Sequence, residues 1–283
     1  MRIILTAIAL VTLLATPLFA HELAETLPQI EKSGEIRIGY RDSSPPMSSL
    51  NKDGNPEGYS IDLCKEIVAG IENKIGKNIK IKYVPVTSTE RFKALSNNKI
   101  DILCGVTTKT LKRGEIVDFT QLTFVTGAAF MTLKNTDLMN NFDGKKVGVV
   151  KSSTTYTALK ELFEDPEINA EIVLVESRAE GLKALEKGEV DAISADQVVL
   201  IGMALKSGNP EKYAILPNVI SYEPFALAVR KNDADFRLEA DRVLSRLYRS
   251  KKIMPIYFKW FGLFSSQIPP AFEAVIQINA IPE

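Results

Sequence analysis

The sequence predicts an α/β fold made of two units, each with a largely parallel sheet. Segments with the apolar or alternating patterns of strands take turns with segments of helical periodicity along most of the chain. Such alternation is typical of parallel sheets covered by helices. Four polar loops directly follow expected strands, and 283 residues are enough for two domains.

The first part of the chain begins this alternation. Residues 35–40 alternate as a strand, the apolar positions of 60–75 have helical spacing, and residues 79–84 alternate again. Thr87 and Glu90 have the spacing of a capping box, which predicts a helix with Ser88 and Arg91 in its first turn. A short buried strand is then expected around residues 100–103.

The second part of the chain continues the alternation of strands and helices. It follows an apolar stretch, residues 124–133, that could pass from one unit to the other. Strands are expected at residues 146–150, 171–175, 190–194, 213–216 and 225–230. Helices are expected up to Leu162, over 179–187, from Asp233 onward, and finally around residues 256–261. Ile268-Pro269-Pro270 is expected to break the chain after this last helix.

A hydroxyl-rich loop follows the strand at residues 100–103. Thr107, Thr108 and Thr110 are followed by Arg113. A strand that opens into such a loop leaves N–H and O–H groups free, and an arginine adds a planar charged fork suited to a carboxylate. The alternative is a polar surface loop with a solvated arginine.

Four further positions allow both a ligand role and an ordinary structural one. Arg41 follows the first strand, and Arg91 could either reach solvent or face a ligand carboxylate. The run Ser153-Thr154-Thr155 could cap a helix or hold an anion at its N-terminus. Asp196 could cap the next helix or accept hydrogen bonds from an ammonium group. Ligands of α/β units gather at the carboxyl ends of strands, where Arg41, Thr108, Ser153 and Asp196 all fall.

The charge balance narrows the range of partners. The 35 basic and 35 acidic residues cancel, so no net field would recruit nucleic acid or a membrane surface. We see no cluster of metal ligands and expect no cofactor. The single histidine, His21, falls at the expected mature N-terminus.

Residues 1–20 have the pattern of a secretory signal peptide, with Arg2, an apolar run from Ile3 to Leu14, and cleavage after Ala20. Pro17 and the threonines make a poor membrane span, which argues against an uncleaved anchor. The mature chain is therefore expected in an oxidising compartment. There Cys64 and Cys104 form either a disulfide or two buried free thiols.

The motifs together resemble a periplasmic solute-binding protein of the polar amino-acid family that serves ABC importers. The resemblance covers residues 27–270 and rests on the segments GYRDSSPP at 39–46, GYSIDLCKEI at 58–67, KIDILCGVTTKTLKRGEIVDFT at 99–120, KKVGVVKSSTT at 145–155, GEVDAISAD at 188–196 and ALAVRKND at 226–233. Within the family the chain is most similar to the glutamate/aspartate-binding branch. It departs from the pattern in having Ser153 where glycine is usual and Arg178 where that branch tends to have histidine.

The resemblance implies a type II periplasmic binding protein with two lobes joined by two crossover strands. Lobe 1 would comprise residues 22–125 and 222–283, and lobe 2 residues 126–221. Ligand binding would close the hinge, and the closed form would dock on an inner-membrane permease. We expect a periplasmic monomer and not an enzyme.

An acidic amino acid carries two carboxylates and one ammonium group, and the candidate residues divide among them. The α-carboxylate suits Arg113, Thr108 and the run Ser153-Thr154-Thr155. The ammonium suits Asp196 and the carbonyl near Val106. The side-chain carboxylate is left for Arg41, Ser88 and Arg91. Unpaired charge in a closed cleft is costly, so these arginines favour an acidic side chain.

Three other functions share these features. The same fold occurs in periplasmic cyclohexadienyl or arogenate dehydratases, although the mature chain has no internal histidine and a prephenate-like ligand has no ammonium for Asp196. A binder of another polar amino acid is the second alternative. A free-standing sensor or adhesin is the third.

Overall fold

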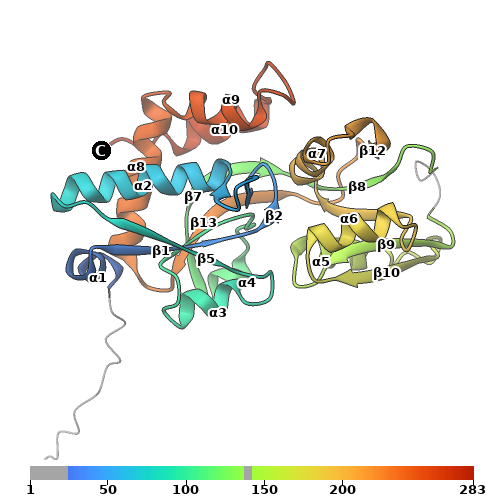
Figure 1. The fold of residues 1–283 in the computed structure, drawn as a ribbon, viewed down its shortest axis with the longest axis horizontal. Coiled ribbons are helices and arrows are strands. Elements are labelled where there is room, and N and C mark those ends of the chain that lie inside the picture. The colour runs from blue at the N-terminus through green and yellow to red at the C-terminus, as the bar shows by residue number, and fades with distance from the viewer. Residues whose placement is uncertain (1–24, 137–141) are drawn as a thin grey trace, which may run out of the picture.

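The protein has two lobes, each built on a five-stranded sheet, in a computed structural model that describes residues 25–136 and 142–283 (Figure 1). The expected signal peptide, residues 1–20, lies outside the described residues. Within the described ranges, no helix has the length and apolarity needed to cross a membrane.

Strands far apart in the sequence pair within each sheet. The sheet of lobe 1 contains, in spatial order, β5 (Lys80–Pro85), β1 (Glu35–Tyr40), β6 (Ile102–Cys104), β13 (Glu223–Arg230) and β7 (Val117–Thr126). The sheet of lobe 2 contains β10 (Ala170–Val175), β9 (Lys145–Val150), β11 (Ala192–Asp196), β8 (Ala128–Leu133) and β12 (Tyr213–Ile215). A small third sheet contains β2 (Ser43–Ser44), β3 (Ser48–Leu50) and β4 (Pro56–Glu57).

Helices cover both faces of the large sheets (Figure 1). Lobe 1 has α1 (Thr26–Ser33), α2 (Tyr59–Ile75), α3 (Arg91–Ser96), α4 (Leu111–Gly114), α8 (Ala234–Arg249), α9 (Ile253–Phe261) and α10 (Pro270–Asn279). Lobe 2 has α5 (Thr154–Leu162), α6 (Arg178–Glu186), α7 (Gln197–Lys206) and the short 3₁₀ helix η1 (Pro210–Lys212).

The two sheets have the same internal arrangement. In each sheet one strand runs against the other four: β13 in lobe 1 and β8 in lobe 2. These are the strands by which the chain enters each lobe from the other one. The remaining four strands point the same way, so their carboxyl ends share one edge of the sheet, where ligands of α/β units gather.

The lobe boundaries expected from the sequence lie close to these crossings. β7 ends at Thr126 and β8 begins at Ala128, while β12 ends at Ile215 and β13 begins at Glu223. We therefore keep residues 126–221 as the proposed extent of lobe 2.

The C-terminal end of the chain differs from the sequence expectation. The proline pair at 269–270 does not end the ordered structure, because Pro270 is the first residue of a further helix, α10. Proline is well tolerated at this position, since its missing N–H would have no partner there anyway. Phe272 of α10 is buried and stacks on Tyr257 with ring centroids 4.6 Å apart, in a cluster that includes Phe124 and Phe261.

The start of α3 also differs. The helix begins at Arg91, so Ser88 lies in the turn before it and not in its first turn as expected. The Thr87 hydroxyl accepts a hydrogen bond from the Glu90 N–H (3.2 Å) and donates one to the Glu90 carboxylate (2.8 Å). The capping-box residues therefore stabilise a turn that precedes the helix.

Helix α2 holds the loop that leads into the cleft. Cys64 forms a disulfide with Cys104 at the end of β6, with the Cα atoms 6.4 Å apart. One turn earlier, the Ser60 hydroxyl donates a hydrogen bond of 2.8 Å to the Gly105 carbonyl. Positions four residues apart share one helix face, so α2 fixes the end of β6 at two adjacent points.

We predict that this disulfide contributes about 4 kcal/mol to the free energy of unfolding, given the 40-residue separation of its cysteines. Guanidinium unfolding of Cys64→Ala, Cys104→Ala and the double variant would measure it. Each single variant already removes the bridge, so the double variant should lose little more. Additive losses, or two free thiols by mass spectrometry, would contradict the prediction.

Candidate functional site

A polar cavity lies between the lobes, where loops at the carboxyl ends of the strands meet. Its lining consists of Ser88, Arg91, Val106, Thr108, Arg113, Ser153, Thr154, Thr155, Arg178 and Asp196. Nine of the ten ligand-binding residues expected from the sequence are in this lining. Arg41, the tenth, is not among the lining residues, and Arg178 is the additional one.

Arg41 lies buried beside the cavity. Its Cγ would be 2.9 Å from a Cβ added at Gly105, so glycine there makes room for this side chain. Its Nε has no hydrogen-bond partner. Burial and the nearby Arg178 guanidinium lower the pKa of Arg41 to about 10. The group therefore adds positive potential to the cavity without lining it.

Phe92 supports the two arginines of lobe 1 that do line the cavity. The guanidinium carbons of Arg91 and Arg113 lie 4.6 and 5.4 Å from the centre of its ring. Arg91 donates to the Ser88 carbonyl (2.5 Å), and Arg113 donates to the Thr108 carbonyl (2.8 Å). Both side chains are thus held in place by groups of the protein itself, which lowers the entropy cost of binding.

The N-terminus of α5 supplies the lobe 2 side of the cavity. Ser153 is the N-cap: its hydroxyl accepts from the Tyr156 N–H (3.0 Å) and donates to the Val150 carbonyl (2.7 Å). The capping role therefore occupies this hydroxyl. It leaves the N–H groups of the first helical turn, at Thr154 and Thr155, to meet an anion.

Asp196 ends β11 and precedes α7, but its side chain does not cap that helix. Its carboxylate instead accepts a hydrogen bond of 2.9 Å from Arg178, the first residue of α6. Burial raises the pKa of Asp196, and the Arg178 charge partly offsets that rise. The helix-cap alternative for Asp196 is therefore wrong in this structure.

Glu223 is a buried residue at the site that the sequence reading did not identify. It begins β13 and accepts hydrogen bonds from three hydroxyl groups: those of Thr108, Thr154 (2.7 Å) and Ser221 (2.7 Å). Because Thr108 belongs to lobe 1 and Thr154 to lobe 2, one carboxylate joins both lobes. The Thr108 hydroxyl, expected to face a ligand carboxylate, is engaged here instead.

The cavity disfavours its own positive charges. The pKa of Arg91 is well below its ordinary value because of burial and the charges of Arg113, Arg41 and Arg178. Burial also lowers the pKa of Arg113, with Glu223 and Asp196 acting in the opposite direction. An anion placed among these groups would relieve both the repulsion and the lost solvation.

The lobes touch across the cleft at several points. Arg91 donates to the Ser152 carbonyl (3.4 Å), and Arg178 donates to the Ser44 hydroxyl (3.1 Å). In α7, a Cβ added at Gly202 would lie only 2.4 Å from the Pro45 carbonyl oxygen. This approach of lobe 2 to lobe 1 therefore requires a glycine.

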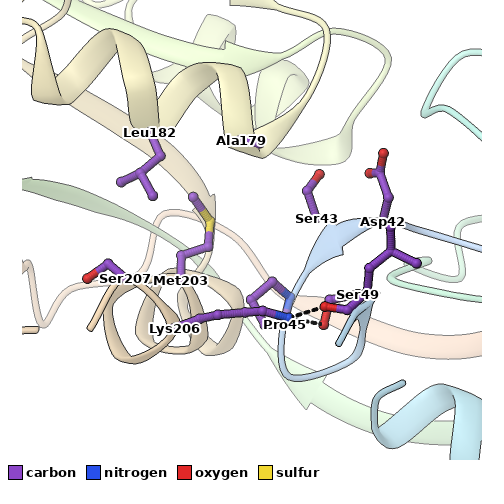
Figure 2. Close-up of a pocket in the computed structure, with 10 residues that line it drawn as sticks. Asp42, Ser43, Pro45, Ser49, Ala179, Leu182, Met203, Lys206 and Ser207 are labelled. Atoms are coloured by element: carbon purple, nitrogen blue, oxygen red, sulfur yellow. Dashed lines mark hydrogen bonds between the residues drawn. The ribbon is translucent and has the colours of Figure 1, made fainter. Parts of the chain in front are cut away.

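A second cavity lies beside the first, between α6, α7 and the segment around Pro45 (Figure 2). Leu182 and Met203 give it an apolar lining, and Lys206 donates a 3.0 Å hydrogen bond to the Ser49 hydroxyl. It lacks the cluster of buried charges found in the polar cavity. In the part of the chain that the structure describes, no group of three or more acidic, histidine or cysteine side chains could hold a metal ion.

Known proteins resemble this chain over most of its length. An L-glutamate/L-aspartate-binding protein of Pseudomonas aeruginosa is 31% identical over 271 residues, which cover 94% of this chain and 89% of the relative. An ABC transporter glutamine-binding protein of Bacillus subtilis is 30% identical, covering 83% of this chain and 84% of the relative.

A solved structure of an amino acid-binding protein is also similar to this chain over most of its length. The ancestral amino acid-binding protein described as a precursor of cyclohexadienyl dehydratase superposes with a TM-score of 0.73 at 27% identity, covering 83% of this chain and 99% of its own. Residues 36–263 match the family described as bacterial extracellular solute-binding proteins, family 3. The chain belongs to this family of solute-binding proteins, with the type II two-lobed fold.

Proposed function

We propose that this protein captures an acidic amino acid, glutamate or aspartate, in the periplasm by hinge closure and delivers it to an ABC permease. The observation that carries the proposal is the buried arginine cluster at the polar cavity: Arg91 and Arg113 line it, Arg41 lies behind Gly105, and burial lowers the pKa of all three. Relatives whose names describe them as glutamate/aspartate-binding or as solute-binding proteins of glutamate/aspartate import support it.

The two carboxylates of such a ligand would occupy different corners of the cavity. Arg113 and the N-terminus of α5 would hold the α-carboxylate, because they combine a guanidinium with free N–H groups from the opposite lobe. Arg91 and Ser88 would hold the side-chain carboxylate, with Arg41 adding positive potential from behind Gly105. Asp196 would accept hydrogen bonds from the ammonium.

Closure follows from a ligand that touches both lobes. Each lobe alone offers only part of the site, so the ligand binds best when the lobes meet, and this shifts the equilibrium to the closed form. We propose that the signal peptide is removed, that the mature protein is a monomer, and that the closed form docks on the permease.

We predict that glutamate binds roughly tenfold to a hundredfold more tightly than glutamine. The two are nearly the same size, and losing one charge-assisted contact in a buried site costs about 1.5–3 kcal/mol. Calorimetry on ligand-free protein would measure both affinities. Equal affinities would refute the acidic ligand and favour a general polar amino-acid binder.

Two arginine variants should distinguish the residues that bind the side-chain carboxylate from those that bind the α-carboxylate. Arg91→Ala should shrink the preference for glutamate over glutamine, because it removes the contact to the side-chain carboxylate. Arg113→Ala should weaken both ligands together, because both carry the α-carboxylate. Arg242→Ala, a half-exposed arginine of α8, is the matched control and should change neither affinity. An unchanged preference in Arg91→Ala would contradict the assignment.

A further prediction concerns closure itself. Gly202→Ala places a methyl group against the Pro45 backbone, and overpacking of this kind costs about 1–3 kcal/mol. The cost falls on the closed form, so glutamate affinity should drop roughly tenfold or more while the melting temperature of the ligand-free protein stays nearly constant.

Small-angle scattering should show a more open Gly202→Ala protein at the glutamate concentration that closes the unmodified one. Gly114→Ala is the control, because nothing lies within 4 Å of its added Cβ. Unchanged glutamate affinity in Gly202→Ala would show that binding does not need this approach of the lobes.

A further inference from the structure

Arg178 pairs with the Asp196 carboxylate, the group that we expect to bind the ammonium of an amino-acid ligand. Its Nη2 lies 2.9 Å from the Asp196 carboxylate, and the two side chains are only 8% and 4% exposed. Its Nη1 donates to Ser44 of lobe 1 at 3.1 Å. Asp196 therefore has a cationic partner from the protein itself.

The Asp196 carboxylate does not need an ammonium group to balance its charge. Asp196 and Arg178 form an ion pair that is neutral by itself. The guanidinium groups of Arg91 and Arg113 remain to meet anionic groups of a ligand, with Glu223 offsetting part of the charge at Arg113.

The free hydrogen-bonding groups lead to the same conclusion. The Nε donors of Arg91 and Arg178, two residues that line the cavity, are buried and have no partner. Buried donors without partners are costly, so they favour a ligand rich in acceptors. Carboxylates and a ketone only accept hydrogen bonds, whereas an ammonium group adds three more donors.

We propose that the cleft also accepts dicarboxylates that lack a free ammonium group, such as 2-oxo dicarboxylates, and that Arg178 is the residue that admits them. The proposal rests on the proposed function, because the same two corners hold the two carboxylates. Arg178 neutralises Asp196, which would otherwise repel such a ligand. The absence of an ammonium group is therefore no argument against a ligand of this site.

The test compares glutamate with 2-oxoglutarate, which has nearly the same size and replaces the amino group by a ketone. Calorimetry on ligand-free protein should give affinities within thirtyfold of each other. In Arg178→Gln the ratio of the two affinities should shift at least thirtyfold towards glutamate, whose ammonium can still pair with Asp196. Lys183→Gln, which removes an exposed charge from the same helix, should leave the ratio unchanged.

Two further variants keep the test decisive if Arg178→Gln fails to fold by circular dichroism. Arg178→Lys keeps the charge, so the ratio should stay within tenfold of that of the unmodified protein. Asp196→Asn removes the repelling carboxylate, so it should weaken glutamate and leave 2-oxoglutarate binding the same or tighter. Equal weakening of both ligands in Asp196→Asn would overturn the proposal.

The possible results separate this inference from the function on which it rests. Binding of glutamate with 2-oxoglutarate more than thirtyfold weaker would overturn the inference and leave the proposed function standing. Binding of 2-oxoglutarate without glutamate would support the inference and overturn the amino-acid function. Binding of neither ligand would overturn both. An unchanged ratio in a folded Arg178→Gln would overturn the role of Arg178.

Discussion

Repulsion among buried guanidinium groups at the junction of the lobes governs how this site is built. Arg41, Arg91, Arg113 and Arg178 come from four different loops or helix starts, and each is held by contacts that do not use a ligand. Placing like charges together in a poorly solvated cleft is unfavourable unless anions are supplied. The protein supplies Asp196, Glu223 and, beside Arg41, Asp42, and the positive charge that remains is available to drive binding of an anion.

The two buried acidic residues satisfy their carboxylates in different ways. Asp196 pairs with a cation of its own lobe, while Glu223 accepts hydrogen bonds from hydroxyl groups of both lobes. Hydroxyl donors orient a carboxylate without neutralising its charge, so Glu223 can still offset the arginines nearby. The lobe contacts made through Glu223 lie beside the strands on which the lobes would rotate, at the start of β13.

Some residues have both a structural role and a proposed ligand-binding role, although the sequence analysis offered these roles as alternatives. Ser153 caps α5 with its hydroxyl, and Thr154 and Thr155, whose N–H groups have no intrahelical acceptor at a helix start, line the cavity beside it. The disulfide between Cys64 and Cys104, together with Ser60, fixes the end of the strand from which the Thr108 and Arg113 loop departs. A rigid support of this kind positions a binding loop at little entropy cost.

The sequence by itself determined the alternation of strands and helices and the polar loops after several strands, because both are local features. Its resemblance to a family of solute-binding proteins implied the two lobes and most of the residues that line the cavity. The sequence reading missed α10, since a proline pair is compatible with either a break or a helix start, and only the packing of Phe272 on Tyr257 decides between them. It missed Glu223, and it could not pair Asp196 with Arg178, 18 residues away. Charge pairing of this kind depends on which loops the two sheets bring to a shared edge, and that is a property of the tertiary structure alone.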